Sequence, residues 1–149
     1  MKAVIQRVLR ARVLVDGEPV GEINEGLLAL VAFEKGDDEA VAKRTAEKLV
    51  HLRVFEDEAG KMNLSALDAG RGILLVPNFT VAGSTRKGHR PSFDGAMEPE
   101  GASRLFDILV ETTGNMGVKT ARGIFGAHMQ VELVNDGPVT VIIELKGDS

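Results

Sequence analysis

The chain has 149 residues, of which 44% are apolar and 27% charged, and a chain of about 150 residues buries roughly 70% of its unfolded surface without help from disulfides or a structural metal. It contains no cysteine, which excludes a thiol nucleophile, a thiolate zinc site, an iron–sulfur cluster and a disulfide framework. A net charge of −4, with no Trp and no Tyr, argues against a protein that coats nucleic acid electrostatically or stacks several bases at once, although a local basic patch remains compatible with it.

Apolar and polar side chains alternate at the start of the chain, which predicts strands over 2–9 and 11–15. Because this start has no uninterrupted apolar run, we expect neither a signal peptide nor a membrane span, and therefore a soluble cytoplasmic protein. Asp16-Gly17 predicts a turn before a short strand at 20–23. A continuous apolar run over 27–33 is typical of a strand buried on both faces.

Two amphipathic segments predict helices, one over roughly 38–50 and one over 98–114. Further strands are predicted at 53–56, 72–76, 118–123, 128–135 and 139–145. Asn135-Asp136-Gly137 predicts a hairpin turn between the last two strands. We therefore expect one domain over residues 1–149, of the mixed α/β (α+β) class, in which a curved, barrel-like mixed sheet carries two main helices.

Several common catalytic patterns are missing from the sequence. Ser84 lies in Ala-Gly-Ser-Thr-Arg instead of a nucleophile elbow, and the chain has no phosphate loop, dinucleotide fingerprint or His-Glu-x-x-His. The three histidines, His51, His89 and His128, are far apart, and each is interpreted as a surface or helix histidine. Any hydrolysis would therefore depend on main-chain dipoles, a bound water or groups of the substrate.

The first candidate segment follows the buried strand at 72–76. Pro77 cannot donate a hydrogen bond to a sheet, so the strand should end or bulge there. The amides of Asn78, Phe79 and Thr80 would then be free to face a ligand. The alternative is an ordinary strand end with an Asn turn.

The second candidate segment is a basic loop over 84–93. It carries three permanent cations, Arg86, Lys87 and Arg90, together with a histidine and no acidic residue, in a protein that is acidic overall. Arginine forks and backbone amides in such a loop suit phosphate groups, so anion or RNA contact is one interpretation. A solvated charged loop is the other.

The third candidate segment runs from Phe125 to Thr140. Asn-Asp-Gly alone is an ordinary hairpin turn, but Pro138 stands where a hairpin would use a backbone donor. The residues do not specify the isomer of the Gly137–Pro138 bond. In the cis form the two residues would present successive carbonyls to one side, and Gly137 would let a ligand approach the backbone closely.

These segments together resemble the D-aminoacyl-tRNA deacylase family, first described as D-tyrosyl-tRNA deacylase. The order and spacing of the matching segments carry the resemblance over nearly the whole chain. They are Met1–Val8 (MKAVIQRV), Val15–Gly21, Glu34–Asp37, Leu52–Leu64 (LRVFEDEAGKMNL), Thr85–Phe93 (TRKGHRPSF) and Phe125–Thr140 (FGAHMQVELVNDGPVT).

The resemblance implies a cytoplasmic homodimer that hydrolyses the ester between a D-amino acid and the 3′-terminal adenosine of tRNA, and also glycine mischarged on tRNA-Ala. It implies a cis Gly137–Pro138 bond whose carbonyls enter the active site of the partner subunit. There they would act as a chiral filter that rejects L side chains. Arg7 would hold the Gly-Pro segment and Met129 would pack beside it. No cofactor and no metal site is expected.

The resemblance also implies how the ester is held. The terminal adenosine would lie near Phe125 and Met129, with the ester carbonyl against the amides of Phe79 and Thr80 and with the ribose hydroxyl of the RNA helping to activate water. This sequence departs from the family's Ser-Gln-x-Thr motif, because Pro77 and Asn78 stand in place of Ser and Gln. A proline at this place also occurs in a related branch with relaxed chirality, so the departure bears on D-selectivity.

Thr80 is the one hydroxyl placed to act as a nucleophile, but no histidine or lysine stands at a readable spacing to activate it, so we expect it to position the substrate. Two other functions stay open on the sequence. One is a small RNA- or nucleotide-binding module without catalysis. The other is a metal-free hydrolase of small metabolites.

Overall fold

The computed structural model describes residues 1–147, and its central feature is a six-stranded mixed sheet. The strands follow the order β2-β1-β3-β6-β7, and β8 pairs with β1. β3 and β7 each run parallel to β6, whereas β1 is antiparallel to β2, β3 and β8. Their bounds are β1 Lys2–Val15, β2 Glu18–Ile23, β3 Gly26–Ala32, β6 Gly72–Pro77, β7 Thr120–Arg122 and β8 Gln130–Glu144.

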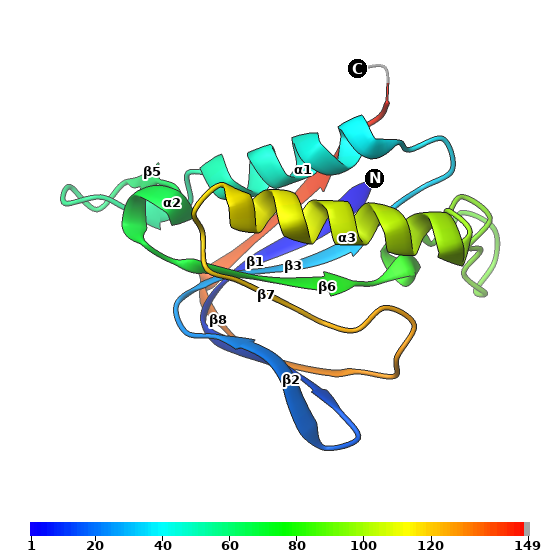
Figure 1. Ribbon diagram of the computed structural model, residues 1–149, viewed down its shortest axis with the longest axis horizontal. Coiled ribbons are helices and arrows are strands. Elements are labelled where there is room, and N and C mark those ends of the chain that lie inside the picture. The colour runs from blue at the N-terminus through cyan, green and yellow to red at the C-terminus, as the bar shows by residue number, and fades with distance from the viewer. Residues whose placement is uncertain (148–149) are drawn as a thin grey trace.

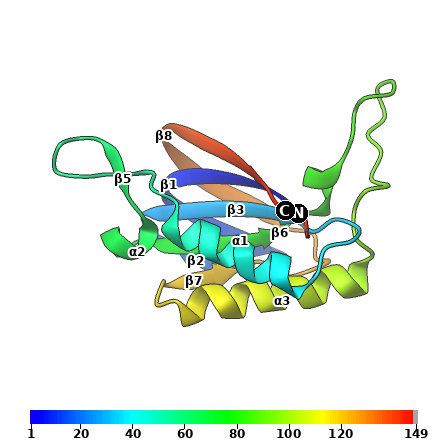
Figure 2. The ribbon, with the colours of Figure 1, turned by 90° about the horizontal axis from the view of Figure 1, so that it is seen from above.

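Two long helices lie side by side over one face of this sheet (Figures 1 and 2). They are α1, Glu39–His51, and α3, Pro99–Asn115. The prediction of one domain with a mixed sheet and two main helices is confirmed, although Asp148 and Ser149 lie outside the described residues. Of the short elements, β4 (Phe55–Glu56) falls within the strand predicted at 53–56. The sequence did not predict β5 (Met62–Leu64), α2 (Ala66–Ala69) or the 3₁₀ helix η1 (Phe79–Ala82).

The helix starts follow from capping chemistry. The Asp38 side chain accepts a hydrogen bond from the Val41 amide at the start of α1. At the start of α3 the Glu98 carboxylate accepts from two amides, and Pro99 occupies a first-turn position where its missing N–H costs nothing. Within residues 1–147 no helix is long and apolar enough to cross a membrane.

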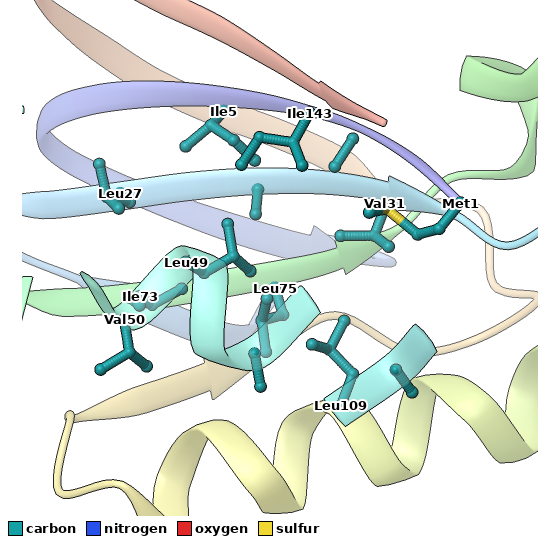
Figure 3. Close-up of a cluster of buried hydrophobic side chains, with 14 of the residues drawn as sticks. Met1, Ile5, Leu27, Val31, Leu49, Val50, Ile73, Leu75, Leu109 and Ile143 are labelled. Atoms are coloured by element: carbon teal, nitrogen blue, oxygen red, sulfur yellow. The ribbon is translucent and has the colours of Figure 1, made fainter. Parts of the chain in front are cut away.

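The sheet buries apolar side chains on both of its faces. Leu27 and Leu75 pack toward α1 and α3 in the larger cluster, part of which Figure 3 shows. Their neighbours Leu28 and Leu74 point to the opposite face and pack in a second cluster with Val8. Because all residues of β3 and β6 except the half-buried Leu30 and Pro77 are buried, the interpretation of these apolar runs as buried strands is confirmed.

The second cluster lies inside the curve of the sheet, which is nearly closed into a barrel. A Cβ atom on Gly21 of β2 would overlap the carbonyl oxygen of Arg122 in β7, so the two edges of the sheet approach closely there. Asp16-Gly17 forms the expected turn between β1 and β2, and both residues have positive φ, 50° and 79°. The expectation of a curved, barrel-like sheet is therefore confirmed.

The arm that carries β4 and β5 is organised by two carboxylates. Asp57 accepts hydrogen bonds from the backbone amides of Lys61 and Ala59, which lower the pKa of its carboxyl group. Asp68 and Ser65 form a capping box at α2, and the hydrogen bond from the Ser65 amide lowers the pKa of Asp68. Both groups stabilise the fold above their ordinary pKa, and the contribution is lost as the pH falls through the lowered value.

The predicted hairpin at Asn135-Asp136-Gly137 is wrong. Residues 128–135 and 139–145 do not pair with each other but form one strand, β8, along the whole of β1. Val8 pairs with Asn135 and Gln6 with Thr140, so the intervening residues of β8 leave the ladder as a bulge. This bulge contains the Gly-Pro dipeptide.

Candidate active site

The end of β6 is the first part of the site. Pro77 is the last residue of β6 and lies beside Val31 of β3. The ladder continues for one more residue, because the Asn78 amide donates to the Val31 carbonyl at 2.8 Å. The expectation that the Asn78 amide is free is therefore wrong: a parallel neighbour strand uses it.

The two amides that follow have no such partner. η1 begins at Phe79, and the Val81 amide donates back to the Asn78 carbonyl at 3.2 Å. The N–H groups of Phe79 and Thr80 precede this first turn, and no acceptor within residues 1–147 meets them. Both residues are exposed, so two successive donors point to a ligand or solvent at the surface.

The side chains of the same motif bond to each other. The Thr80 hydroxyl donates to the Asn78 amide oxygen at 2.5 Å. An amide oxygen is a hydrogen-bond acceptor but not a base that could deprotonate an alcohol. The pair therefore fixes the start of η1 without forming a nucleophile and its base.

A small cavity of about 20 Å³ adjoins these amides. It lies between the strand end and the helix layer, where Phe106 of α3 lines it, and the half-buried Phe125 also lines it. The residues that line it are Val31, Ala32, Phe33, Pro77, Asn78, Phe79, Ala102, Phe106 and Phe125. Phe125, which the resemblance expects near the terminal adenosine, thus lies close to the strand-end motif.

Met129 also lies at this end of the molecule. A Cβ atom on Gly123 would come within 2.8 Å of the Met129 sulfur and 3.4 Å of Pro77 Cδ, so all three residues meet. Met129 therefore lies beside the strand-end motif. It directly precedes β8, and on the order of 25 Å of extended chain separates it from Gly137. Within one chain it does not pack beside the Gly-Pro segment.

The bulge of β8 presents Gly137 and Pro138 to solvent, and both are exposed. Their peptide bond is cis, as the resemblance implied. Gly137 has a φ of 150°, and a Cβ atom there would lie 2.6 Å from the Val139 amide nitrogen. A side chain at position 137 would therefore clash with the backbone of Val139, and it would also block a ligand from approaching the Gly137 backbone.

Arg7 of β1 holds the bulge of β8 through a hydrogen bond and an ion pair. This arginine is 8% exposed; its Nε donates to the Asp136 carbonyl at 3.0 Å and its Nη1 to the Val54 carbonyl at 2.7 Å. The Asp136 carboxylate lies 3.5 Å from Nε and adds an ion pair. The predicted role of Arg7 as the support of the Gly-Pro segment agrees with these contacts.

Asn135 closes the base of the bulge, and sequence reasoning did not single it out. Its amide oxygen accepts from the Val139 N–H at 2.9 Å, and its amide nitrogen donates to the Val139 carbonyl at 3.1 Å. The side chain thus replaces the ladder partner that β8 loses at the bulge. The position of Asn135 before Asp-Gly was visible in the sequence, but it was interpreted only as part of a turn. Val54, whose carbonyl is the other acceptor of Arg7, was not singled out either.

The two halves of the candidate site lie apart in one chain. Val31 at the strand end pairs with Ala3 of β1, whereas Arg7 under the bulge pairs with Leu27. Four residues along β1 and three strand spacings across the sheet separate Pro77 from the bulge, on the order of 20 Å. A ligand the size of an aminoacyl group cannot touch both motifs of the same chain.

The basic loop forms an arm with a closed base, which extends away from the sheet in Figure 2. Ser84 and Ser92 exchange two backbone hydrogen bonds, of 2.7 and 2.8 Å. Within the described part of the chain no carboxylate pairs with Arg86, Lys87 or Arg90, and all three are exposed. The arm therefore offers three uncompensated cations next to η1.

The histidines take no part in this geometry. His51 ends α1 and lies 3.6 Å from Glu47, and all three histidines are exposed, as expected. No cluster of three His, Cys, Asp or Glu side chains that could hold a metal occurs among residues 1–147. Two larger hollows, of about 440 and 520 Å³, lie at Arg10–Arg12 with β8 and at α1 with Arg53; neither contains a residue of the strand-end motif or the bulge.

Known proteins share both the sequence and the fold. The family described as D-Tyr-tRNA(Tyr) deacylase matches residues 4–144. The D-aminoacyl-tRNA deacylase of Pelobacter propionicus is 57% identical over 97% of this chain and 99% of its own, and that of Geobacter metallireducens is 57% identical over 97% and 95%. The solved structure of a c-Myc DNA Unwinding Element Binding Protein is 38% identical, with a TM-score of 0.91 over 99% of this chain and 100% of that one.

A second solved structure, of a probable eukaryotic D-amino acid tRNA deacylase, has a TM-score of 0.84 over 97% of this chain and 98% of its own. At 15% identity it shows the shared fold alone. These relatives define a class of enzyme, the deacylases, which hydrolyse acyl bonds. The chain belongs to the D-Tyr-tRNA(Tyr) deacylase family.

Proposed function

We propose that the chain hydrolyses the ester bond of D-aminoacyl-tRNA, releases the free D-amino acid and tRNA, and acts on glycine mischarged on tRNA-Ala as well. Family membership supports the reaction class, and the names of the relatives supply the substrate. The observation that carries the mechanism is the pair of unpartnered amides at Phe79 and Thr80. A reaction in which tRNA is the substrate also favours the cytoplasm.

In this proposal the two amides hold the ester carbonyl. When water attacks, negative charge develops on that oxygen, and each preorganised donor stabilises it by on the order of 3 kcal/mol. The adenine lies against the surface beside Phe125, over the mouth of the small cavity, which brings the ester to the start of η1. The ribose hydroxyl of the terminal adenosine helps to activate the water, because the described residues offer no base next to Thr80.

The bulge supplies the chirality check in a dimer. Because Gly137 and the Phe79 amide are too far apart within one chain, the Gly-Pro segment reaches an active site only in a second copy. There its carbonyls occupy the space that an L side chain would need, while a D side chain points away and glycine has none. The contacts of Arg7 and Asn135 keep the carbonyls in place. Pro77 and Asn78, which replace Ser and Gln of the family motif, set how strict this selection is.

Timed deacylation of matched D-tyrosyl-, L-tyrosyl- and glycyl-tRNA, each with and without a chelator, tests the proposal. We expect D-tyrosyl- and glycyl-tRNA to lose their ester and L-tyrosyl-tRNA to keep it, with no effect of the chelator. A chelator-sensitive rate or equal cleavage of both enantiomers would contradict the mechanism.

Two further results would replace the proposed function. Binding of tRNA without loss of the ester would favour an RNA-binding module, a function closer to the nucleic-acid binding for which the 38%-identical relative is named. Hydrolysis of small free esters together with indifference to tRNA would favour a metabolite hydrolase. The assay therefore separates the three functions with one set of substrates.

A further inference from the structure

Phe79 combines an unusual exposure with a fixed orientation. All six phenylalanines lie within the described residues, and four of them are buried or half-buried. Phe79 and Phe93 are 57% and 38% exposed. Leaving an aromatic ring in water gives up the free energy of its burial, so two neighbouring exposed rings indicate a contact surface.

The two rings hold each other. Their centroids are 5.3 Å apart and their planes meet at 75°, an edge-to-face contact. Gly83 makes this possible, because a Cβ atom there would come within 2.7 Å of the Phe93 ring. The hydrogen bonds between Ser84 and Ser92 then fix Phe93 at the base of the basic arm. The Phe79 ring is therefore supported on one side by Phe93 and exposed on the other.

The surroundings of the ring fit single-stranded RNA. The cations of Arg86, Lys87 and Arg90 stand on the arm that ends at Phe93, without a carboxylate partner among residues 1–147. Proteins that bind single-stranded nucleic acid combine two features: cations that contact the phosphates and aromatic rings on which bases stack. Both features are present here. With one ring available, the surface suits one base.

We propose that the Phe79 ring, held by Phe93, stacks the nucleobase that precedes the terminal adenosine. This inference rests on the proposed function. The amide of Phe79 contacts the ester carbonyl in that function, and the adenine lies against Phe125 at the mouth of the small cavity. The next nucleotide is then the part of the RNA that reaches a side chain on the same residue, while its phosphate faces the arm.

Two substrates separate stacking from catalysis. D-Tyrosyl-tRNA carries the penultimate base, whereas D-tyrosyl-adenosine ends at the terminal nucleoside and lacks it. We expect Phe79→Ala to lower the ratio of kcat/KM for D-tyrosyl-tRNA to that for D-tyrosyl-adenosine about tenfold. Phe79→Tyr, which retains a ring, should keep the ratio of the unmodified protein. Met62→Ala, which truncates a 53% exposed side chain on β5, serves as the matched control and should also keep it.

Three results would overturn the stacking role. One is an unchanged ratio in Phe79→Ala, and another is an equal loss on both substrates, which would mean that the ring only supports the amides. The third is a changed oligomeric state of Phe79→Ala in sedimentation, which would assign the ring to contact with a second copy. If the unmodified protein cleaves neither substrate, the proposed function itself fails. The assay of the unmodified protein therefore distinguishes this failure from a failure of the stacking role, which only the Phe79 variants reveal.

Discussion

Thr80 carries a hydroxyl at the place where an ester would be attacked, yet its bonding argues against a covalent role. The hydroxyl donates its proton to the Asn78 amide oxygen at 2.5 Å. A serine or threonine nucleophile needs a base that accepts this proton, and an amide oxygen is too weakly basic to do so. In the proposed function Thr80 contributes its backbone amide, which a change of the side chain to Ala or Ser leaves in place.

We therefore expect Thr80→Ala to keep substantial activity, with kcat for D-tyrosyl-tRNA reduced by about tenfold or less, since the hydroxyl contributes one neutral hydrogen bond. Single-turnover assays measure this rate, and acid quenching followed by mass spectrometry looks for an acyl group on the protein. Thr80→Ser provides the control that retains the hydroxyl. Complete loss of activity in Thr80→Ala, with an acylated protein trapped in Thr80→Ser, would instead make Thr80 the nucleophile.

The individual site residues differ in how far the sequence could predict them. The breaking effect of Pro77 is local, so the end of β6 was foreseeable. Whether the next amide is free depends on the neighbouring strand, and the Val31 carbonyl that engages the Asn78 amide is distant in the chain. The same holds for Val54 beneath Arg7, at a separation of 47 residues. Long-range partners of this kind leave no local pattern in a sequence.

At the scale of elements, the helices and buried strands were predictable and the path of β8 was not. α1 and α3 lie within one residue of the expected ranges, because their apolar spacing and caps are local signals. Asn-Asp-Gly is equally suited to a hairpin turn and to a bulge, and β1 decides between them. A strand of 14 residues in β1 offers a partner to both parts of β8, so the chain continues instead of reversing.

The basic arm is the element for which electrostatics makes a quantitative prediction. Arg86 and Lys87 stand there unpaired, and each cation that neutralises a phosphate of single-stranded RNA contributes about 0.7 to the slope of log affinity against log salt. Changing both to Gln should flatten the slope for tRNA binding by about 1.4. Fluorescence anisotropy of labelled tRNA at several salt concentrations measures it.

The matched control changes the same charge elsewhere. Lys48→Gln with Lys61→Gln alters α1 and the β4–β5 arm, away from η1. We expect the slope for this control to stay within experimental error of the unmodified protein. If both double variants lower the slope equally, the effect is one of net charge, and the basic arm has no special contact with RNA.

At the scale of the molecule, the sheet separates two motifs that the proposed function needs side by side, the strand end of β6 and the Gly-Pro segment of β8. β1 is the central strand that pairs with β2, β3 and β8, so it links the strand end of β6 to the bulge of β8. The same pairing keeps the two motifs on the order of 20 Å apart. In the proposed function a homodimer resolves this, because each copy would then lend its Gly-Pro segment to the other.

Mixing two defective variants tests this arrangement. Gly137→Ala alters the lent segment, since a Cβ atom there meets the Val139 backbone, and Phe125→Ala removes the side chain against which the adenine is proposed to lie. Each alone should cleave D-tyrosyl-tRNA poorly or without discrimination. Subunit exchange at a ratio of one to one makes half of the dimers mixed, and one of their two sites then combines both intact halves, so about one quarter of the discriminating activity should return. Activity that stays at the level of the separate variants, although mass spectrometry shows mixed dimers, would place both motifs of a working site in the same chain.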